Sequence, residues 1–366
     1  MSGGVDSSVA AALLQRDGHE VVGCFMRLGS PGEELETPLD GGACAAGAAR
    51  IGHQGCCSIN DAADARLVAA KLDIPFYVVN FRNDFGRIIS YFESEYHAGR
   101  TPNPCVRCND WLKFGKLRQY AEQLGCDAVA TGHYARIASA DGAPRIARGL
   151  DRSKDQSYVL FGVGAQALAR MLLPIGGMEK PEVRDIARAL SLPVFDKPDS
   201  QEICFVPDDY AAFLRRRDPS RFAEGPIVDT SGRELGRHEG HQHFTVGQRK
   251  GIRVPATIPL YVLRKDPARN AIVVGPREAL DVLGVVAGEV AWYAEHLLGR
   301  SIECTAQVRA HGAPIPARAT LQERAGALSL DVEFARAESG VAAGQAVVCY
   351  DEEERIIGGG WIAETR

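Results

Sequence analysis

The first 205 residues alternate between stretches with helical spacing of apolar positions and short runs dominated by apolar residues. The predicted helices are residues 7–18, 59–73 and 111–125. The predicted strands are residues 20–28, 76–81 and 127–134. Such alternation is typical of a doubly wound α/β fold, in which helices cover a parallel sheet and ligands bind at the carboxyl ends of the strands.

The pattern changes after Pro207. A short helix is predicted at 208–217, a hairpin at 225–240 with its turn at Ser231 and Gly232, and a glycine-bearing charged loop at 241–252. From about residue 283, short β-prone runs recur every 8 to 12 residues or so, which indicates a small antiparallel barrel. We therefore expect three domains: an α/β domain with a doubly wound parallel sheet (1–205), a small mixed central domain (206–282) and a C-terminal antiparallel β-barrel (283–366).

Composition agrees with a folded chain of several domains. Of its 366 residues, 45% are hydrophobic and 24% are charged. No apolar run approaches the roughly 20 residues of a membrane span, and the start lacks the layout of a secretion signal, so we expect a cytoplasmic protein without membrane contact.

The ten cysteines are too sparse for a disulfide scaffold, and their uneven clustering indicates site chemistry in a reducing compartment. Residues 29–58, rich in Gly and Ala, are predicted to be an insertion or flexible loop. They contain Cys44, Cys56 and Cys57. Most isolated cysteines, such as Cys24, Cys126, Cys304 and Cys349, are expected to be inert core thiols.

The net charge of −5 is unevenly distributed. Residues 206–275 hold twelve Lys and Arg against eight Asp and Glu, together with three histidines at 238, 241 and 243. This stretch could face a polyanion such as a nucleic acid. A solvated surface with scattered charges accounts for the same numbers.

The opening "MSGGVDSSVAAALL" runs two glycines, an acid and two serines directly into a predicted helix. Glycines let backbone N–H groups turn toward an anion, and the helix N-terminus adds partial positive charge, so the loop suits phosphate. It lacks the lysine of kinase-type loops, which favours a pyrophosphate that leaves. An ordinary helix cap is the alternative.

Cys105 and Cys108 form a Cys-x-x-Cys pair in "GRTPNPCVRCN", and Cys204 follows 96 residues later in "DKPDSQEICFVPDD". The spacing of the pair is compatible with zinc, an iron–sulfur cluster or redox chemistry. Cys204 has polar and acidic neighbours, although a lone thiol is commonly structural. Sulfur transfer requires one cysteine that carries a persulfide and a second thiol close to it.

The stretch Ser-Gly-Gly-x-Asp-Ser resembles the PP-loop of the ATP pyrophosphatase superfamily, whose members transfer AMP to a substrate oxygen. Five further stretches resemble those of bacterial tRNA-specific 2-thiouridylases and occur in the same order: "GRTPNPCVRCN", "ATGHYAR", "KDQSYVL", "DSQEICFV" and "GQRKGI". The resemblance extends from residue 2 to near the C-terminus. It implies ATP-dependent replacement of oxygen by sulfur at carbon 2 of the wobble uridine.

Two other functions are compatible with these residues. One is a PP-loop AMP-transferring synthetase that acts on another substrate, for which no paired thiols are needed. The other is a non-catalytic protein that binds RNA or an iron–sulfur cluster.

The resemblance implies roles for the cysteines. Cys108 would be the nucleophile and Cys204 the carrier of the persulfide, and sulfur would be released through a Cys108–Cys204 disulfide or as sulfide. Some relatives have Asp where this chain has Cys105, so an acid/base role does not transfer to it. The alternative is a [4Fe–4S] cluster with Cys105, Cys108 and Cys204 as its ligands. The persulfide route is preferred to this cluster, and the cluster is preferred to a zinc site.

The resemblance also implies binding residues and partners: ATP, Mg²⁺, the anticodon region of tRNA and a sulfur-donor protein. The predicted ATP-binding residues are Ser2, Gly3, Gly4, Val5, Asp6, Ser7, Ser8, Met26 and Gly132, with Asp6 a candidate ligand of Mg²⁺. The predicted residues for the extruded target base are Asn103, Pro104 and Cys105. The predicted tRNA contacts are Lys154, Asp155, Gln156 and Arg309, of which Asp155 is better suited to orienting its loop.

Three further expectations follow, the first from the residues themselves and the other two from departures from the pattern of the relatives. Arg249, Lys250 and Arg215 to Arg217 suit the nucleic-acid backbone. Ala310 stands where relatives carry an aromatic residue, which removes stacking there. A PP-loop ordinarily follows a buried strand of about five residues, yet this sequence opens almost on the loop, so we expect either an upstream start or one strand fewer and weak ATP binding.

Overall fold

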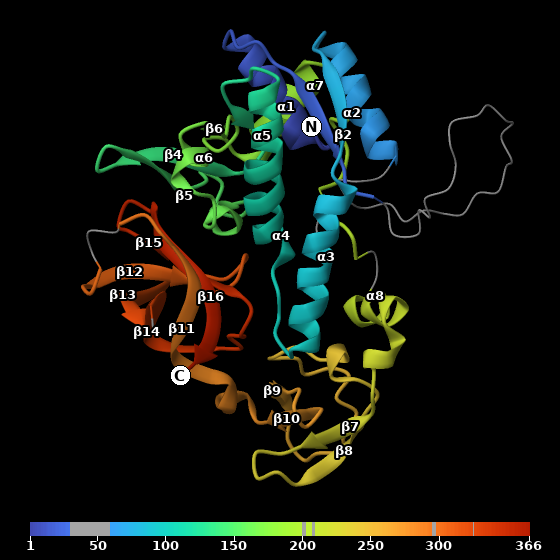
Figure 1. Ribbon diagram of the computed structural model, residues 1–366, viewed down its shortest axis with the longest axis vertical. Helices are drawn as coiled ribbons and strands as arrows, with labels where there is room; N and C mark the ends of the chain where they lie inside the picture. The colour runs from blue at the N-terminus through green and yellow to red at the C-terminus, as the bar shows by residue number, and fades with distance from the viewer. Residues whose placement is uncertain (30–58, 200–202, 207–208, 295–297, 325) are drawn as a thin grey trace, which may run out of the picture. The chain divides into compact units, whose positions relative to one another are not determined.

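The computed structural model describes residues 1–29, 59–199, 203–206, 209–294, 298–324 and 326–366 (Figure 1). Two compact parts are distinguished. The first compact unit joins Met1–Phe85 to Pro181–Asp209, and the second compact unit joins Gly86–Lys180 to Tyr210–Arg366. The three predicted domains are a different division and remain a prediction. The predicted insertion at 29–58 lies, except for Gly29, outside the described residues, and so do its three cysteines.

Parallel strands form the sheet of the first compact unit. Strand β1 (Gly23–Arg27) pairs in parallel with β2 (Phe76–Asn80), and helices α1 (Val5–Arg16) and α2 (Ile59–Lys71) precede them in turn. Residues 8–14 of α1 are all buried, because a run of Val, Ala and Leu fills the core on every side of the helix. The predicted α/β alternation is confirmed here, with slightly shorter elements. Helix α7 (Lys180–Ala189) begins at the boundary and belongs mostly to this unit.

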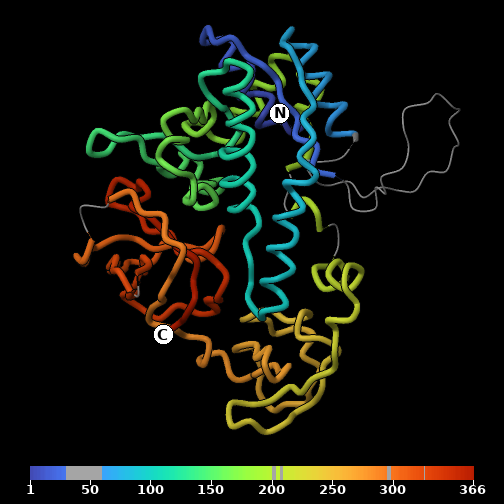
Figure 2. Tube along the Cα trace, in the orientation of Figure 1, coloured from blue at the N-terminus to red at the C-terminus, as the bar shows by residue number. Residues whose placement is uncertain are grey.

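A long helical stretch carries the cysteine pair in the second compact unit. It begins with α4 (Pro104–Arg107), continues as a π-helix (Cys108–Lys116) and ends with α5 (Leu117–Gln123), as the trace in Figure 2 shows. Pro104 starts it because its fixed φ suits the first helical position. The wide π-turn needs Gly115, since a Cβ there would lie 2.8 Å from the Asp110 carbonyl oxygen. The sequence predicts this helix only from residue 111.

The strand predicted at 127–134 is wrong beyond Ala130. Strand β3 (Val129–Ala130) pairs in parallel with β6 (Met171–Leu172), after which the chain leaves the sheet. It continues as the hairpin β4 (Ala135–Ala140) and β5 (Ala143–Arg148). Asp141 and Gly142 both have positive φ in the turn, as a two-residue hairpin loop requires. Helices α3 (Arg82–His97), which crosses the boundary between the units, and α6 (Ala165–Leu168) complete this region.

The central part of the second compact unit is small and mixed. Helix α8 (Tyr210–Arg217) precedes a sheet of order β8-β7-β10-β9. Its strands are β7 (Gly225–Val228), β8 (Glu234–His238), β9 (Tyr261–Asp266) and β10 (Ala271–Gly275). The predicted hairpin is confirmed as the antiparallel pair β7–β8, while β7 and β10 run parallel.

Six antiparallel strands close into a barrel at the C-terminus, as predicted (Figure 1). In barrel order they are β11 (Asp281–Trp292), β14 (Ala327–Ser339), β13 (Ile315–Arg324), β12 (Ser301–Gln307), β15 (Ala346–Tyr350) and β16 (Ile356–Thr365). Along the first eight residues of β13, buried side chains alternate with exposed or partly exposed ones, as expected for a strand with one face toward the barrel interior. No helix in the part of the chain that is described combines the length and apolar character needed to cross a membrane.

Candidate functional site

The opening loop leaves backbone donors at the start of α1. Gly3 has φ +71°, and Gly4 caps the helix without a side-chain hydrogen bond to its N–H groups. The Ser7 hydroxyl accepts from the Ser2 N–H at 3.0 Å, and the Ser8 hydroxyl donates to the Gly4 carbonyl at 2.7 Å. The serines thus order the loop from within, and the first-turn N–H groups suit a phosphate anion.

Three other predicted ATP-binding residues differ in burial. Val5 is buried and contributes its backbone, whereas Asp6, in the first turn of α1, is only partly buried. Met26 is a half-buried residue of β1 beside Val79 of β2. These residues belong to the first compact unit, and Gly132, which follows β3, belongs to the second.

Lys197 is a residue of this site that sequence reasoning did not identify. Its ammonium donates to the Gly3 carbonyl at 2.9 Å and to carboxylate oxygens of Asp61 and Asp64, each at 2.6 Å. Burial opposes the charge, but the two carboxylates outweigh it and raise the pKa of Lys197. Gly3 also packs so closely on α2 that a Cβ would lie 2.2 Å from the Asp61 carbonyl oxygen. The loop is therefore fixed to α2 by charge and by close packing.

The cysteine pair lies at the start of the helical stretch. Asn103 caps α4, Pro104 is buried, Cys105 is exposed and Cys108 is half-buried as the first residue of the π-helix. Thus the residues predicted to meet the target base are consecutive and precede the proposed nucleophile by three positions.

Arg107 holds this segment rigidly. Its side chain is 10% exposed, forms an ion pair with Glu289 at 2.7 Å and lies over the Trp361 ring with its guanidinium carbon 4.2 Å from the centroid. Two further rings, of Tyr91 and Trp111, lie about the same guanidinium. A buried, paired arginine between the two cysteines gives both thiols a fixed backbone.

Cys204 is half-buried in the first compact unit, whereas Cys105 and Cys108 belong to the second. The next residue, Phe205, is buried and packs edge-on against Phe85 with 5.5 Å between ring centroids. The approach of Cys204 to Cys108 remains a prediction. Within the described residues, no group of three or more His, Cys, Asp or Glu side chains is arranged to hold a metal ion, so the three-cysteine cluster also remains a prediction.

The carboxylate of Asp155, in the "KDQ" stretch, is buried and forms an ion pair and hydrogen bonds within the protein. Its side chain is 6% exposed and pairs with Arg148 at 2.9 Å, and it accepts hydrogen bonds from Gly149 N–H at 2.9 Å and the Ser157 hydroxyl at 3.0 Å. This geometry suits the orienting role better than contact with tRNA. Its neighbours are more accessible, since Lys154 is half-buried and Gln156 is exposed.

The other candidate tRNA contacts differ in how far they are paired. Arg309 is half-exposed and pairs with Glu338 at 2.7 Å, while Arg217 forms an ion pair with Glu93. Arg249 and Lys250 are exposed. Within the described residues these two form no ion pair, so of the four cations they are the ones not already paired with a carboxylate.

Lys113 and His133 form a second cationic feature that the sequence did not indicate. The Lys113 ammonium lies 3.3 Å from His133 Nε2, and His133 Nδ1 lies 2.7 Å from the Thr131 hydroxyl. Burial, reinforced by the lysine charge, lowers the pKa of His133 well below its ordinary value. A neutral imidazole thus contacts an ammonium directly beyond the carboxyl end of β3. "ATGHYAR" could have drawn attention to His133, but no local pattern links it to Lys113.

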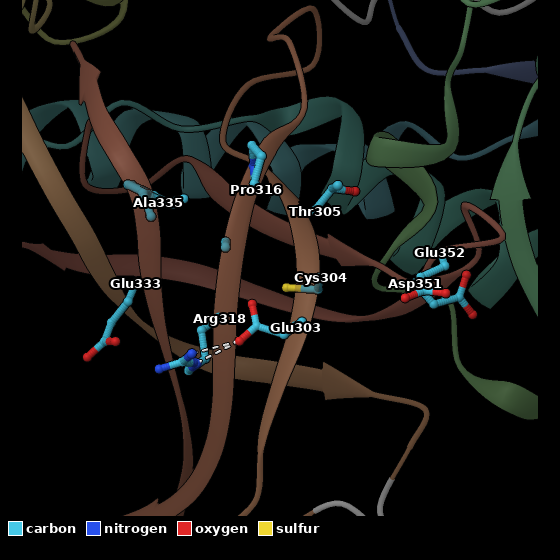
Figure 3. Close-up of a pocket in the computed structure, with 11 residues that line it drawn as sticks. Glu303, Cys304, Thr305, Pro316, Arg318, Glu333, Ala335, Asp351 and Glu352 are labelled. Atoms are coloured by element: carbon cyan, nitrogen blue, oxygen red, sulfur yellow. Dashed lines mark hydrogen bonds and ion pairs between the residues drawn. The ribbon is translucent and has the colours of Figure 1, made fainter.

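A groove of about 450 Å³ on the barrel is a different kind of surface (Figure 3). Acidic side chains line much of it, including Glu333, Asp351 and Glu352, and Glu303 pairs with Arg318 at 2.8 Å. Its acidic lining disfavours phosphate, so we do not assign the nucleotide to it.

Three protein-family models match the chain in succession. They are described as a tRNA methyl transferase HUP domain at residues 1–208, a tRNA methyl transferase PRC-barrel domain at 211–276 and an aminomethyltransferase β-barrel domain at 283–362.

Several curated proteins are similar over nearly the full length. The protein named tRNA-specific 2-thiouridylase MnmA from Rhodopirellula baltica is 44% identical over 99% of this chain and 94% of its own. The proteins of the same name from Geotalea uraniireducens and Chloroflexus aggregans are each 46% identical over 99% of this chain, and 93% and 97% of theirs.

Proposed function

This chain belongs to the tRNA-specific 2-thiouridylase family of tRNA sulfurtransferases, and we propose that it thiolates carbon 2 of the wobble uridine by AMP transfer followed by persulfide transfer. The observation that carries the proposal is the near-complete similarity to 2-thiouridylases, combined with a phosphate-suited loop, an exposed Cys105 and a half-buried Cys108. The family's ATP use fits the loop at Ser2–Ser8, which presents N–H groups without side-chain caps.

The first step activates the base. The uracil O2 attacks the α-phosphorus of ATP, the bond to pyrophosphate breaks, and AMP becomes attached to O2. Ser2 to Ser8 and Met26 would hold the nucleotide with Gly132, and Asn103, Pro104 and Cys105 would receive the extruded base. Mg²⁺ bound with ATP would neutralise phosphate charge, and the Asp6 carboxylate fits a role in holding it because it lies partly exposed in the first turn of α1.

The second step transfers sulfur. The terminal sulfur of a Cys204 persulfide attacks C2, and AMP leaves with the former O2. The Cys108 thiolate then attacks Cys204 Sγ, which releases the thiouridine and forms a Cys108–Cys204 disulfide that an external thiol must reduce. In the second variant, Cys108 first displaces hydrosulfide from the persulfide, and this sulfide attacks C2. Both routes conserve sulfur and electrons.

A sulfur-donor protein is the proposed source of the persulfide, and Lys154, Gln156 and Arg309 are proposed tRNA contacts, with Asp155 ordering their loop. A three-cysteine [4Fe–4S] cluster is the proposed alternative sulfur carrier. Its three thiolate donors suit iron chemically, but in the described residues no set of three or more such side chains forms a ligand group, and we route no step through it.

The test is tRNA thiolation with ATP, Mg²⁺ and a persulfide donor such as glutathione persulfide, which can pass its outer sulfur to Cys204. Product is detected as 2-thiouridine by mercury-gel retardation, together with pyrophosphate release. We expect tRNA-dependent pyrophosphate release and loss of product in Cys108→Ser and Cys204→Ser. Cys105→Ala separates the routes, because it should retain product under the persulfide route and lose it if a cluster is required. Full thiolation by Cys108→Ser would contradict the proposal.

A further inference from the structure

Lys113 is a partly exposed cation with unused donors. It lies in the π-helix, and its ammonium contacts His133 Nε2 at 3.3 Å. In the described residues it forms no ion pair with a carboxylate. An ammonium has three N–H donors, so two remain after His133 is satisfied.

His133 orients the ammonium without neutralising it. Because a lysine ammonium only donates, Nε2 must accept and the ring proton lies on Nδ1, which donates to the Thr131 hydroxyl at 2.7 Å. His133 is 7% exposed, so its ring is fixed by packing as well. The full positive charge of Lys113 therefore stays available to a ligand.

The position of this ammonium is that of a ligand site. Thr131 and His133 follow β3 immediately, and the carboxyl ends of parallel strands are where α/β folds bind nucleotides. The π-helix also relates Lys113 to Cys108. Lys113 follows Cys108 by five residues. In an α-helix this spacing would turn the two side chains about 140° apart around the axis. In the π-helix, which repeats about every five residues, the two side chains lie one turn apart on the same face.

We propose that Lys113 binds a phosphoryl oxyanion during thiolation and is held for this by the His133–Thr131 pair, an inference that rests on the proposed function. The oxyanion has two potential sources, the α-phosphate of ATP that leaves as AMP and a backbone phosphate beside the extruded uridine. An ammonium without a carboxylate partner, adjacent to a neutral acceptor, suits either one.

Lys113→Met is the test variant, Lys113→Arg retains the charge, and Lys116→Met is the matched control, since Lys116 is an exposed lysine of the same π-helix. The three measurements are affinity for α,β-methylene-ATP without tRNA, affinity for unmodified tRNA across salt concentrations, and the kcat and KM of thiolation. Thermal melting of each variant monitors the fold.

We expect Lys113→Met to lose about 10- to 100-fold in nucleotide affinity or in kcat if the α-phosphate is the ligand. If a tRNA phosphate is the ligand, tRNA affinity falls instead and its logarithmic salt slope decreases by about 1. Lys113→Arg should recover much of the loss, and Lys116→Met should lie within about twofold of the wild type.

The proposal is overturned if Lys113→Met also stays within about twofold in every measurement, which is the scale of a surface charge. It is equally overturned if Lys113→Arg loses as much as Lys113→Met and both melt early, because the residue would then act through folding. A wild type that binds both ligands but forms no thiouridine would refute the proposed function, while the two binding measurements would still decide the role of Lys113.

Discussion

Removing the Asp155 charge should lower the stability of the fold and have little direct effect on tRNA binding. In Asp155→Asn, the amide keeps the size of the carboxylate but turns an N–H₂ donor or a weaker acceptor toward Arg148, whose side chain is also only 6% exposed. The Arg148 guanidinium keeps Gln307 as an acceptor at 2.7 Å and the Tyr350 ring at 3.7 Å, yet it loses its counter-ion.

Leaving one member of a buried ion pair unpaired costs about 3–5 kcal/mol. In a folding unit of about 250 residues, each kcal/mol lowers the melting temperature by about 2–4 °C, so a decrease of about 6–20 °C is expected. The Arg148→Met/Asp155→Asn double variant should be destabilised by less than the sum of the two single variants, since it removes both charges.

The assay combines thermal unfolding by circular dichroism with tRNA affinity measured well below the melting temperature. Lys154→Ala is the matched comparison on the adjacent, more accessible side chain, and it should weaken tRNA binding while leaving melting nearly unchanged. Asp155→Asn that melts like the wild type but binds tRNA tenfold more weakly would refute this reasoning, because the carboxylate would then act on RNA.

Two further predictions concern single residues. Lys265→Met should stabilise the protein by about 1–3 kcal/mol at pH 7, since Lys265 is 9% exposed and burial lowers its pKa to about 8. Its ammonium meets the Arg100 carbonyl oxygen at 3.5 Å and the Tyr96 ring at 5.2 Å, and within the described residues it has no carboxylate partner. Between pH 8 and 10.5, Lys265 has lost its proton in the folded wild type but keeps it in the unfolded chain, so the stability of the wild type rises with pH. The advantage of Lys265→Met, measured by urea titration, should therefore shrink over this range. An advantage that stays constant would exclude the buried charge as its cause. Gly3→Ala should weaken ATP binding tenfold or more in equilibrium titrations, because its Cβ would lie 2.2 Å from the Asp61 carbonyl oxygen. In the control Gly4→Ala, the Cβ would lie 3.5 Å from the Ser2 hydroxyl, so equal losses in both variants would contradict the packing argument.

Local patterns were sufficient where the structure depends on periodicity. The α/β alternation, the β7–β8 hairpin and the barrel follow from runs of apolar residues and turn signals, and each was predicted. The β4–β5 hairpin was missed although Asp141-Gly142 is a strong local signal for it. The π-helix could not be predicted, since its apolar spacing resembles that of an α-helix and its cause, Gly115 against Asp110, is a contact between backbone turns.

The site was predictable only as far as motifs extend. The motifs direct attention to the loop at Ser2–Ser8 and to the cysteine pair, whose roles stay predictions. Lys197 and Lys113 were missed because the contacts that single them out are with residues distant in sequence. Lys197 contacts Gly3, and Lys113 contacts His133. No spacing rule connects such residues before the chain folds.

Trapping of the sulfur-transfer disulfide tests the central claim most directly. The enzyme, loaded with persulfide, would be mixed with ATP and tRNA for one turnover without a reducing agent, alkylated, digested and analysed by mass spectrometry. The account predicts a peptide pair linked through Cys108 and Cys204 in an amount that matches the 2-thiouridine formed. If the linked pair needs ATP, the persulfide attacks C2 directly; if the pair also forms without ATP, Cys108 releases hydrosulfide first. Stoichiometric 2-thiouridine from a Cys204→Ser enzyme, with no such linked pair in the wild type, would contradict it.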